Sequence, residues 1–241
     1  GIREITLAQE ARKDVPGGKT FTFVVNGRKC FINGANWAPL DGIVARVTPE
    51  KRAQMLSLVR DANLNMLRVW GGGIFEEDDF YDFCDANGIL LWHDFMMACF
   101  VYPGDDAGFR QQLADEIAAA VPRLRNHPAI ALWCGSNESD WAFDNNWYPG
   151  CKANTSLVLE HELIPDLLKT LDPDRPYRPT SPWGGTDVND EDQGDQHWWS
   201  ISIATGGNDT IDYRNYRRAH CTFNSEYGYF GMPAVESIHD Y

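Results

Sequence analysis

The sequence has no long apolar run and few basic residues. No stretch of 18 consecutive apolar residues occurs in its 241 positions, so we expect no membrane-spanning helix. The 21 lysines and arginines face 35 aspartates and glutamates, which gives a formal net charge of −14. Because a surface of this charge repels phosphate groups, we expect no nucleic-acid partner. The composition instead fits a protein that acts on neutral material.

Several cofactor and catalytic motifs are also missing. The six cysteines contain no C-x-x-C pair and no zinc-like spacing, and the histidines are not clustered as metal hydrolysis requires. The G-x-S-x-G turn of serine hydrolases is absent. We therefore predict no metal and no cofactor, and we interpret Cys30, Cys134 and Cys221 as small buried side chains.

Short apolar runs alternate with helix-like segments along most of the chain. The clearest run, residues 129–134 (AIALWC), ends abruptly in Gly-Ser-Asn-Glu, which is typical of a strand buried on both faces. We predict barrel strands at residues 33–37, 65–70, 89–94, 129–134, 177–181, 196–199 and 222–226. We predict helices after Thr48 and at residues 76–87, 109–125 and 156–171, with an aromatic loop at residues 141–154.

Alternating strands and helices indicate the α/β class with a parallel sheet. The length fits one barrel of roughly 250 residues, so we predict a (β/α)8 TIM barrel that is truncated before its eighth strand. A hairpin turn at Asn26-Gly27 precedes the barrel. The alternative is a doubly wound open sheet, but the segment after the first strand, Asn33-Gly34-Ala35-Asn36-Trp37, is not the Gly-rich phosphate turn of that fold.

Two glutamates stand at the ends of predicted strands. Glu138 follows the fourth strand, and Glu226 ends the seventh. The carboxyl ends of barrel strands meet at one face, so both side chains can enter one central pocket. A pair of carboxyl groups is what glycoside hydrolysis requires, because one protonates the leaving oxygen while the other attacks, or assists attack at, the anomeric carbon.

Other strand-end residues could complete such a pocket. The amide of Asn137 can bind a sugar hydroxyl and orient the acid. Arg68 lies in an apolar strand and needs a partner, and it would keep Glu226 ionised by its opposite charge. Five further aromatic and polar residues at strand ends form the predicted wall of a sugar subsite: Trp70, Asp94, Trp183, His197 and Trp198. Each of them alone is more often explained by packing or by a satisfied polar contact, but as a set they fit such a wall.

At these motifs the sequence closely resembles glycoside hydrolase family 2, and within it the β-mannosidase branch. The resemblance rests on the stretches NGANW (33–37), NMLRVWGGG (65–73), WHDFM (92–96), LRNHP (124–128), LWCGSNE (132–138) and SEYGY (225–229). It implies a retaining mechanism with Glu138 as the general acid/base and Glu226 as the nucleophile. It further implies that Asn137 binds near the sugar 2-hydroxyl and that Arg68 supports the nucleophile. Tyr227 departs from the phenylalanine usual after this glutamate.

The resemblance also suggests a domain organisation and a substrate. Residues 1–14 resemble the end of a preceding immunoglobulin-like β-sandwich domain, and residues 15–241 the incomplete barrel, so β-sandwich domains of the full-length chain are expected partners. The expected reaction is release of terminal β-linked mannose from oligosaccharides or glycans. The alternatives are the same chemistry on another β-glycoside, such as a β-glucosaminide, endo-action on mannosyl-glycans, or a barrel that binds glycans without cleaving them.

Overall fold

The computed structural model describes residues 3–201, 212–228 and 235–239; Gly1, Ile2 and Tyr229, which the sequence-based predictions include, lie outside these ranges. Five strands form a parallel sheet in sequential order, and a parallel pair follows them along the chain. The sheet consists of β4 (Gly34–Trp37), β5 (Met66–Val69), β6 (Leu90–Asp94), β7 (Ile130–Cys134) and β8 (Tyr177–Arg178), and the pair consists of β9 (Gln196–Trp198) and β10 (Asn224–Tyr227). All seven predicted strands are confirmed.

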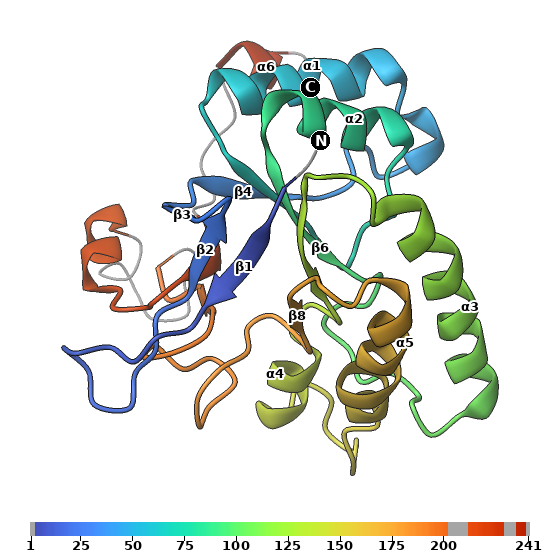
Figure 1. Ribbon diagram of the computed structural model, residues 1–241, viewed down its shortest axis with the longest axis vertical. Helices are drawn as coiled ribbons and strands as arrows, with labels where there is room; N and C mark the ends of the chain where they lie inside the picture. The colour runs from blue at the N-terminus through green and yellow to red at the C-terminus, as the bar shows by residue number, and fades with distance from the viewer. Residues whose placement is uncertain (1–2, 202–211, 229–234, 240–241) are drawn as a thin grey trace.

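The main helices lie on the outside of this sheet, where Figure 1 shows α1, α2, α3 and α5 in an arc around the strands. The helical elements are α1 (Pro49–Asp61), α2 (Asp78–Asn87), α3 (Ala107–Leu124), α4 (Ser139–Asp144), α5 (Ile164–Leu171) and α6 (Val235–His239), with 3₁₀ helices η1 (Val44–Arg46) and η4 (Tyr213–Arg218). The Thr48 hydroxyl caps α1 by accepting from the Lys51 amide at 3.2 Å. Gly88 ends α2 with a φ of 67°, as its position predicts.

Two helical segments differ from the predictions. The segment predicted as an aromatic loop begins with α4, which starts immediately after Glu138. The single helix predicted over residues 156–171 is instead a π-helical turn, η2 (Val158–Leu163), that continues into α5. Pro165 does not break the helix: it lies in the first turn of α5, and Leu163 and Ile164 before it keep right-handed helical backbone angles.

The interior of the barrel is closed from one end by a small N-terminal sheet. β1 (Ile5–Ala8) pairs antiparallel with β2 (Thr22–Val25), which pairs with β3 (Arg28–Cys30) across the predicted Asn26-Gly27 turn. Phe21 and Phe23 are buried against Trp92 and Phe223, with ring centroids 4.9–6.5 Å apart. This aromatic cluster fills the barrel below its polar end, while a second core lies between the sheet and the outer helices.

No helix among the described residues is both long and apolar enough to cross a membrane.

Candidate active site

The two predicted glutamates lie side by side at the carboxyl end of the barrel. Glu138 follows β7, and Glu226 lies within β10. One oxygen of each carboxylate and one ring nitrogen of His197 all lie within 4.8 Å of one another. The fold therefore brings together two glutamates that are 88 residues apart in the sequence, as the predicted barrel topology requires.

Arg68 connects the pocket groups from β5. Its guanidinium donates to Glu226 Oε2 at 2.7 Å, to Asp94 Oδ2 at 2.8 Å and to Asn137 Oδ1 at 2.7 Å. Burial opposes its charge, but the attraction of Asp94 and Glu226 outweighs this penalty and raises the pKa of Arg68. The structure therefore places Arg68, Asp94, Asn137 and Glu226 in one hydrogen-bonded network.

The backbone around Glu138 is held on both sides. The backbone N–H of Asn137 donates to the Met97 carbonyl oxygen at 2.9 Å, and the backbone N–H of Glu138 donates to the Ser181 carbonyl oxygen at 2.8 Å. Glu138 has a φ of 58°, a left-handed conformation that is uncommon for a residue with a side chain and that persists only where the surroundings enforce it. Glu138 is only 6% exposed, and this burial raises the pKa of its carboxyl group.

His197 lies between the two glutamates rather than at a distance in the pocket wall. Its Nδ1 is 2.6 Å from Glu138 Oε1, and its Nε2 is 3.7 Å from Glu226 Oε2. The ring is buried, and desolvation lowers the pKa of His197 to about 4. A neutral ring carries one N–H, so it donates from one nitrogen and accepts at the other.

Several contacting residues escaped sequence reasoning. The Cys99 thiol donates to Glu138 Oε2 at 3.4 Å and accepts from Asn137 Nδ2 at 3.2 Å. The Asp195 carboxylate accepts from Ser181 Oγ and from Ser225 Oγ, each at 2.6 Å, and so links three strand ends. These residues lie in loops or beside strand ends, where no periodicity marks them. Asn36 also contacts the site, because its Oδ1 accepts a hydrogen bond from Arg68 at 3.3 Å. Its position at the end of the first predicted strand is the one signal in the sequence that could have identified it.

The three predicted tryptophans do not join this network. No hydrogen bond or ring contact among the described residues links Trp70, Trp183 or Trp198 to either glutamate. The Trp183 ring instead packs under the Arg178 guanidinium at 4.3 Å. Trp141, which was not predicted, does contact the site. Its indole meets the His197 ring edge-on, with the ring centroids 6.2 Å apart. The role of the predicted tryptophans in a sugar subsite stays a prediction.

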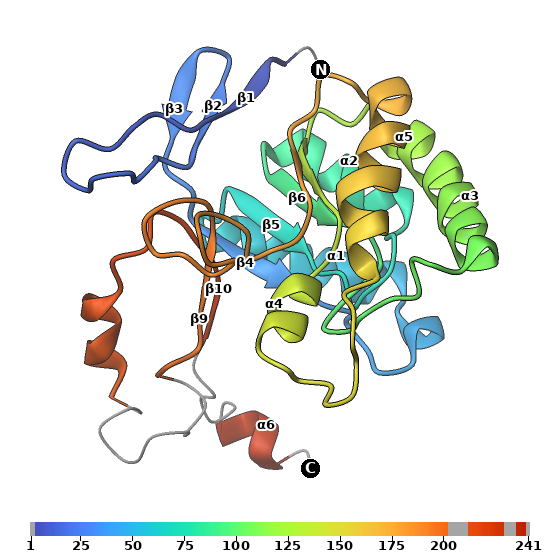
Figure 2. The same ribbon diagram turned by 90° about the horizontal axis from the view of Figure 1, so that it is seen from below.

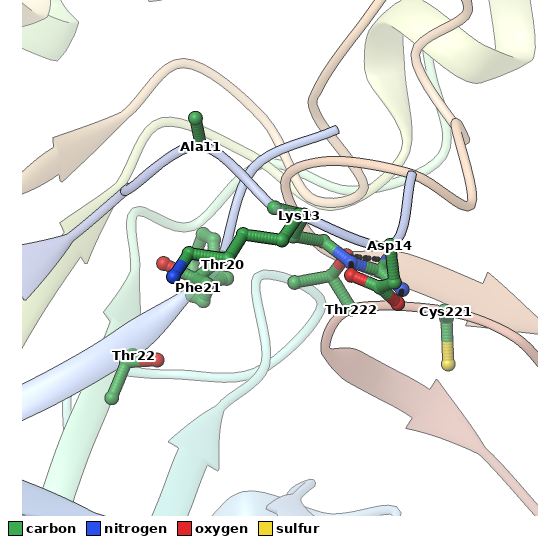
Figure 3. Close-up of a pocket in the computed structure, with 9 residues that line it drawn as sticks. Ala11, Lys13, Asp14, Thr20, Phe21, Thr22, Cys221 and Thr222 are labelled. Atoms are coloured by element: carbon green, nitrogen blue, oxygen red, sulfur yellow. Dashed lines mark hydrogen bonds and ion pairs between the residues drawn. The ribbon is translucent and has the colours of Figure 1, made fainter. Parts of the chain in front are cut away.

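A separate pocket of about 410 Å³ lies at the other end of the strands. It is lined by the N-terminal segment and by the residues just before β10, as Figure 3 shows for Lys13, Asp14, Phe21 and Thr222. Arg12 crosses it to donate to Thr222 Oγ1 at 3.0 Å. It contains neither glutamate, so we do not assign it to the candidate site.

Three groups of carboxylates and histidines among the described residues have the spacing of metal ligands. One is the Glu138, His197 and Glu226 group itself, whose members already bind one another and Arg68. The others are Asp82 with Asp85 and His127, and Asp140 with Glu160 and His161. His161 is isolated in the sequence but not in space.

Residues 19–190 match the family model described as glycosyl hydrolases family 2, TIM barrel domain. The chain belongs to this family. This glycosyl hydrolase family 2 barrel is 35% identical to a β-mannosidase of Capra hircus over 98% of its length and 35% identical to β-mannosidase B of Thermothelomyces thermophilus over 100%. It spans only 28% and 29% of those two relatives.

Solved structures agree with this fold. The crystal structure of a β-D-mannosidase from Dictyoglomus thermophilum superposes with a TM-score of 0.91 at 39% identity, covering 100% of this chain and 28% of that one. A Bacteroides uniformis β-glucuronidase shares the fold at a TM-score of 0.64 and 19% identity. The predicted α/β barrel is therefore confirmed as the TIM barrel of glycosyl hydrolase family 2.

Proposed function

We propose that the protein is a retaining glycoside hydrolase that releases terminal β-linked mannose by double displacement. The observation that carries this proposal is the closeness of Glu138 and Glu226, which have oxygens within 4.8 Å of one another. A retaining pair lies about 5–5.5 Å apart, whereas an inverting pair needs roughly 6.5–9.5 Å to hold a water molecule. The β-mannosidase relatives support the choice of sugar.

In this proposal Glu138 is the general acid and then the general base. Its raised pKa favours the protonated form that can give a proton to the glycosidic oxygen as the bond to the anomeric carbon breaks. After cleavage, the Glu138 carboxylate takes a proton from water, whose oxygen attacks the same carbon.

Glu226 is the proposed nucleophile. One oxygen of its carboxylate forms the bond to the anomeric carbon in the first step and leaves in the second. Arg68 fixes this carboxylate through its 2.7 Å hydrogen bond, and its contact with Asn137 holds the amide that we propose binds the sugar 2-hydroxyl.

Anion rescue of alanine variants in the full chain separates the two roles. With a 4-nitrophenyl β-mannoside, Glu226→Ala should lose roughly 10⁴-fold or more in rate. Azide can then fill the space of the lost carboxylate and attack directly, so the product should be the α-mannosyl azide. Glu138→Ala should lose about 10²–10⁴-fold, and azide should attack the glycosyl-enzyme to give the β-mannosyl azide.

The exposed Glu116→Ala variant on α3 is the matched control and should keep full activity. Full activity in either alanine variant would contradict the mechanism. Binding of mannosides without turnover in the wild type would favour the glycan-binding barrel instead. Faster turnover of a β-glucosaminide, or cleavage only inside glycan chains, would keep the mechanism and replace the substrate.

The domain assignment stays a prediction. β1 lies in the segment assigned to a preceding β-sandwich domain, yet it pairs with β2 of the hairpin.

A further inference from the structure

The hydrogen bonds around His197 determine which of its ring nitrogens carries the hydrogen. Ser181 Oγ lies 3.0 Å from His197 Nε2 and donates its single hydrogen to Asp195 Oδ2 at 2.6 Å. Because that hydrogen is already used, Ser181 Oγ can only accept from Nε2. Glu226 Oε2, at 3.7 Å from the same nitrogen, is a second acceptor. The ring hydrogen is therefore on Nε2.

Asp195 sets the direction of the Ser181 hydrogen. The buried Asp195 carboxyl group also accepts from Ser225 Oγ at 2.6 Å and from the backbone N–H of Trp183 at 3.2 Å. Each of these contacts is a donor, so Asp195 acts as a carboxylate that accepts, and it attracts the nearby Arg178 guanidinium. Ser181 follows β8, Asp195 precedes β9, and Ser225 lies in β10, which Figure 2 shows beside β9.

Arg68 offers no hydrogen to the ring, although its Nη1 lies 3.5 Å from Nε2. The two hydrogens of Nη1 are directed to Glu226 Oε2 at 2.7 Å and to Asn36 Oδ1 at 3.3 Å. Glu226 and Asp195 attract a second proton to the ring. Burial and the charge of Arg68 outweigh this attraction and lower the pKa of His197 to about 4. The ring is therefore neutral, and Nδ1 is an acceptor without a hydrogen.

This bare nitrogen faces the proposed general acid. His197 Nδ1 lies 2.6 Å from Glu138 Oε1, a distance that requires a hydrogen between the two atoms. Since Nδ1 has none, the carboxyl group of Glu138 must supply it from Oε1. The other oxygen, Oε2, accepts from the Cys99 thiol at 3.4 Å, as the carbonyl oxygen of a protonated acid does.

We propose that Asp195 and Ser181 are positioning residues that keep Glu138 protonated in the free enzyme by holding His197 in its Nε2–H tautomer. The inference rests on the proposed function, in which Glu138 is the general acid. The contacts that connect the Asp195 carboxylate to Glu138 Oε1 through the hydroxyl and the ring are 2.6, 3.0 and 2.6 Å long. Both positioning side chains act on Glu138 through the imidazole ring.

Asp195→Asn should reverse the direction of these hydrogen bonds. The Trp183 N–H keeps the amide oxygen on its own side, so the new NH₂ group donates to the Ser181 hydroxyl. The Ser181 hydrogen then points to His197 Nε2, the ring hydrogen moves to Nδ1, and the ring donates to Glu138. Because such a donor stabilises the carboxylate, the alkaline limb of the kcat/KM profile should move down by about 1 pH unit.

Ser181→Ala removes the same connection without changing any charge. The ring is then free to donate from Nδ1, so the alkaline limb should move down by about 0.5–1 pH unit. Ser225→Ala is the matched control, because it deletes the other hydroxyl on the same Asp195 oxygen and leaves the contact between Ser181 and the ring. Its alkaline limb should stay in place. A shift in Asp195→Asn alone would be an effect of charge and would overturn the proposal.

The profiles would be measured on the full chain with phenyl β-mannoside, whose leaving group needs a proton. The acidic limb, set by ionisation of Glu226, should stay within a few tenths of a pH unit, whereas a structural defect would lower the rate at every pH. Asp192→Asn, an exposed residue with the same charge change as Asp195→Asn, should keep both limbs.

Neutron diffraction from wild-type crystals of the full chain keeps the test decisive if the variants fail to fold. On the acidic side of the activity optimum, deuterium should lie on His197 Nε2 and on Glu138 Oε1. Deuterium bonded to Nδ1 would overturn the proposal. This measurement needs no substrate, so it stays separate from the proposed function, which full activity of Glu138→Ala would contradict.

Discussion

The Cys99 thiol is the single neighbour whose effect on the pKa of Glu138 is simplest to test. Burial raises the pKa of Glu138, and the hydrogen bond from the thiol opposes this by stabilising the carboxylate. Cys99→Ala removes that donor, so Glu138 should stay protonated to higher pH. The general acid is active when protonated, and we therefore expect the alkaline limb of the kcat/KM profile to move up, with kcat changed by less than about 10-fold.

The pH profile of a 4-nitrophenyl β-mannoside would be compared with that of Cys151→Ala, an exposed cysteine away from the glutamates. An alkaline limb that stays in place in Cys99→Ala would rule out this influence of the thiol.

Single residues show where sequence reasoning works. Glu138, Glu226 and Arg68 were predictable because each lies at or near the carboxyl end of a predicted barrel strand, where barrel topology directs side chains to one face. Cys99 and Asp195 were not predictable, since their positions depend on loop backbones that no periodicity describes. His197 was placed in the pocket but not between the glutamates, because the ring orientation depends on its contacts.

At the scale of elements, the N-terminal sheet acts as a plug for the barrel. Phe23 is fully buried among Phe21, Trp92 and Phe223, and Trp92 in turn lies 5.9 Å below the Arg68 guanidinium. Phe23→Ala should therefore lower the free energy of unfolding by about 3–5 kcal/mol. Chemical denaturation would measure this loss. Phe31→Ala, 88% exposed, should stay within about 0.5 kcal/mol of the wild type, and equal losses in both would contradict the plug.

Strands proved more predictable than helices in this chain. The buried strands β5, β6 and β7 are short, mostly apolar runs bounded by turn or polar residues, a pattern that is typical of strands in a parallel sheet. The π-helical turn of η2 has no such signature, because it differs from an α-helix only in how the backbone bonds around the buried Glu160. Likewise α4 is six residues long and begins at a left-handed glutamate, which no propensity favours.

The charge of the whole molecule predicts its preference among sugars. The net charge of −14 includes the pocket carboxylates of Asp94 and Glu226, beside which Glu138 supplies a further acidic group. Among the described residues, Arg68 is the cation that contacts these groups, and it is already paired with Asp94 and Glu226. A substrate that carries its own carboxylate therefore meets repulsion of about 4 kcal/mol at 4 Å with an effective dielectric constant near 20.

We therefore expect kcat/KM for a 4-nitrophenyl β-mannoside to exceed that for the matching β-mannuronide by on the order of 100-fold or more. The methyl ester of the mannuronide separates charge from size, because it is bulkier than the acid but neutral. If charge is the cause, the ester should recover most of the lost rate. High salt should recover little, since buried charges are poorly screened. Equal rates for the acid and the mannoside would mean that a positively charged residue outside the described ranges balances the carboxylate of the mannuronide. An ester as slow as the acid would make the barrier steric.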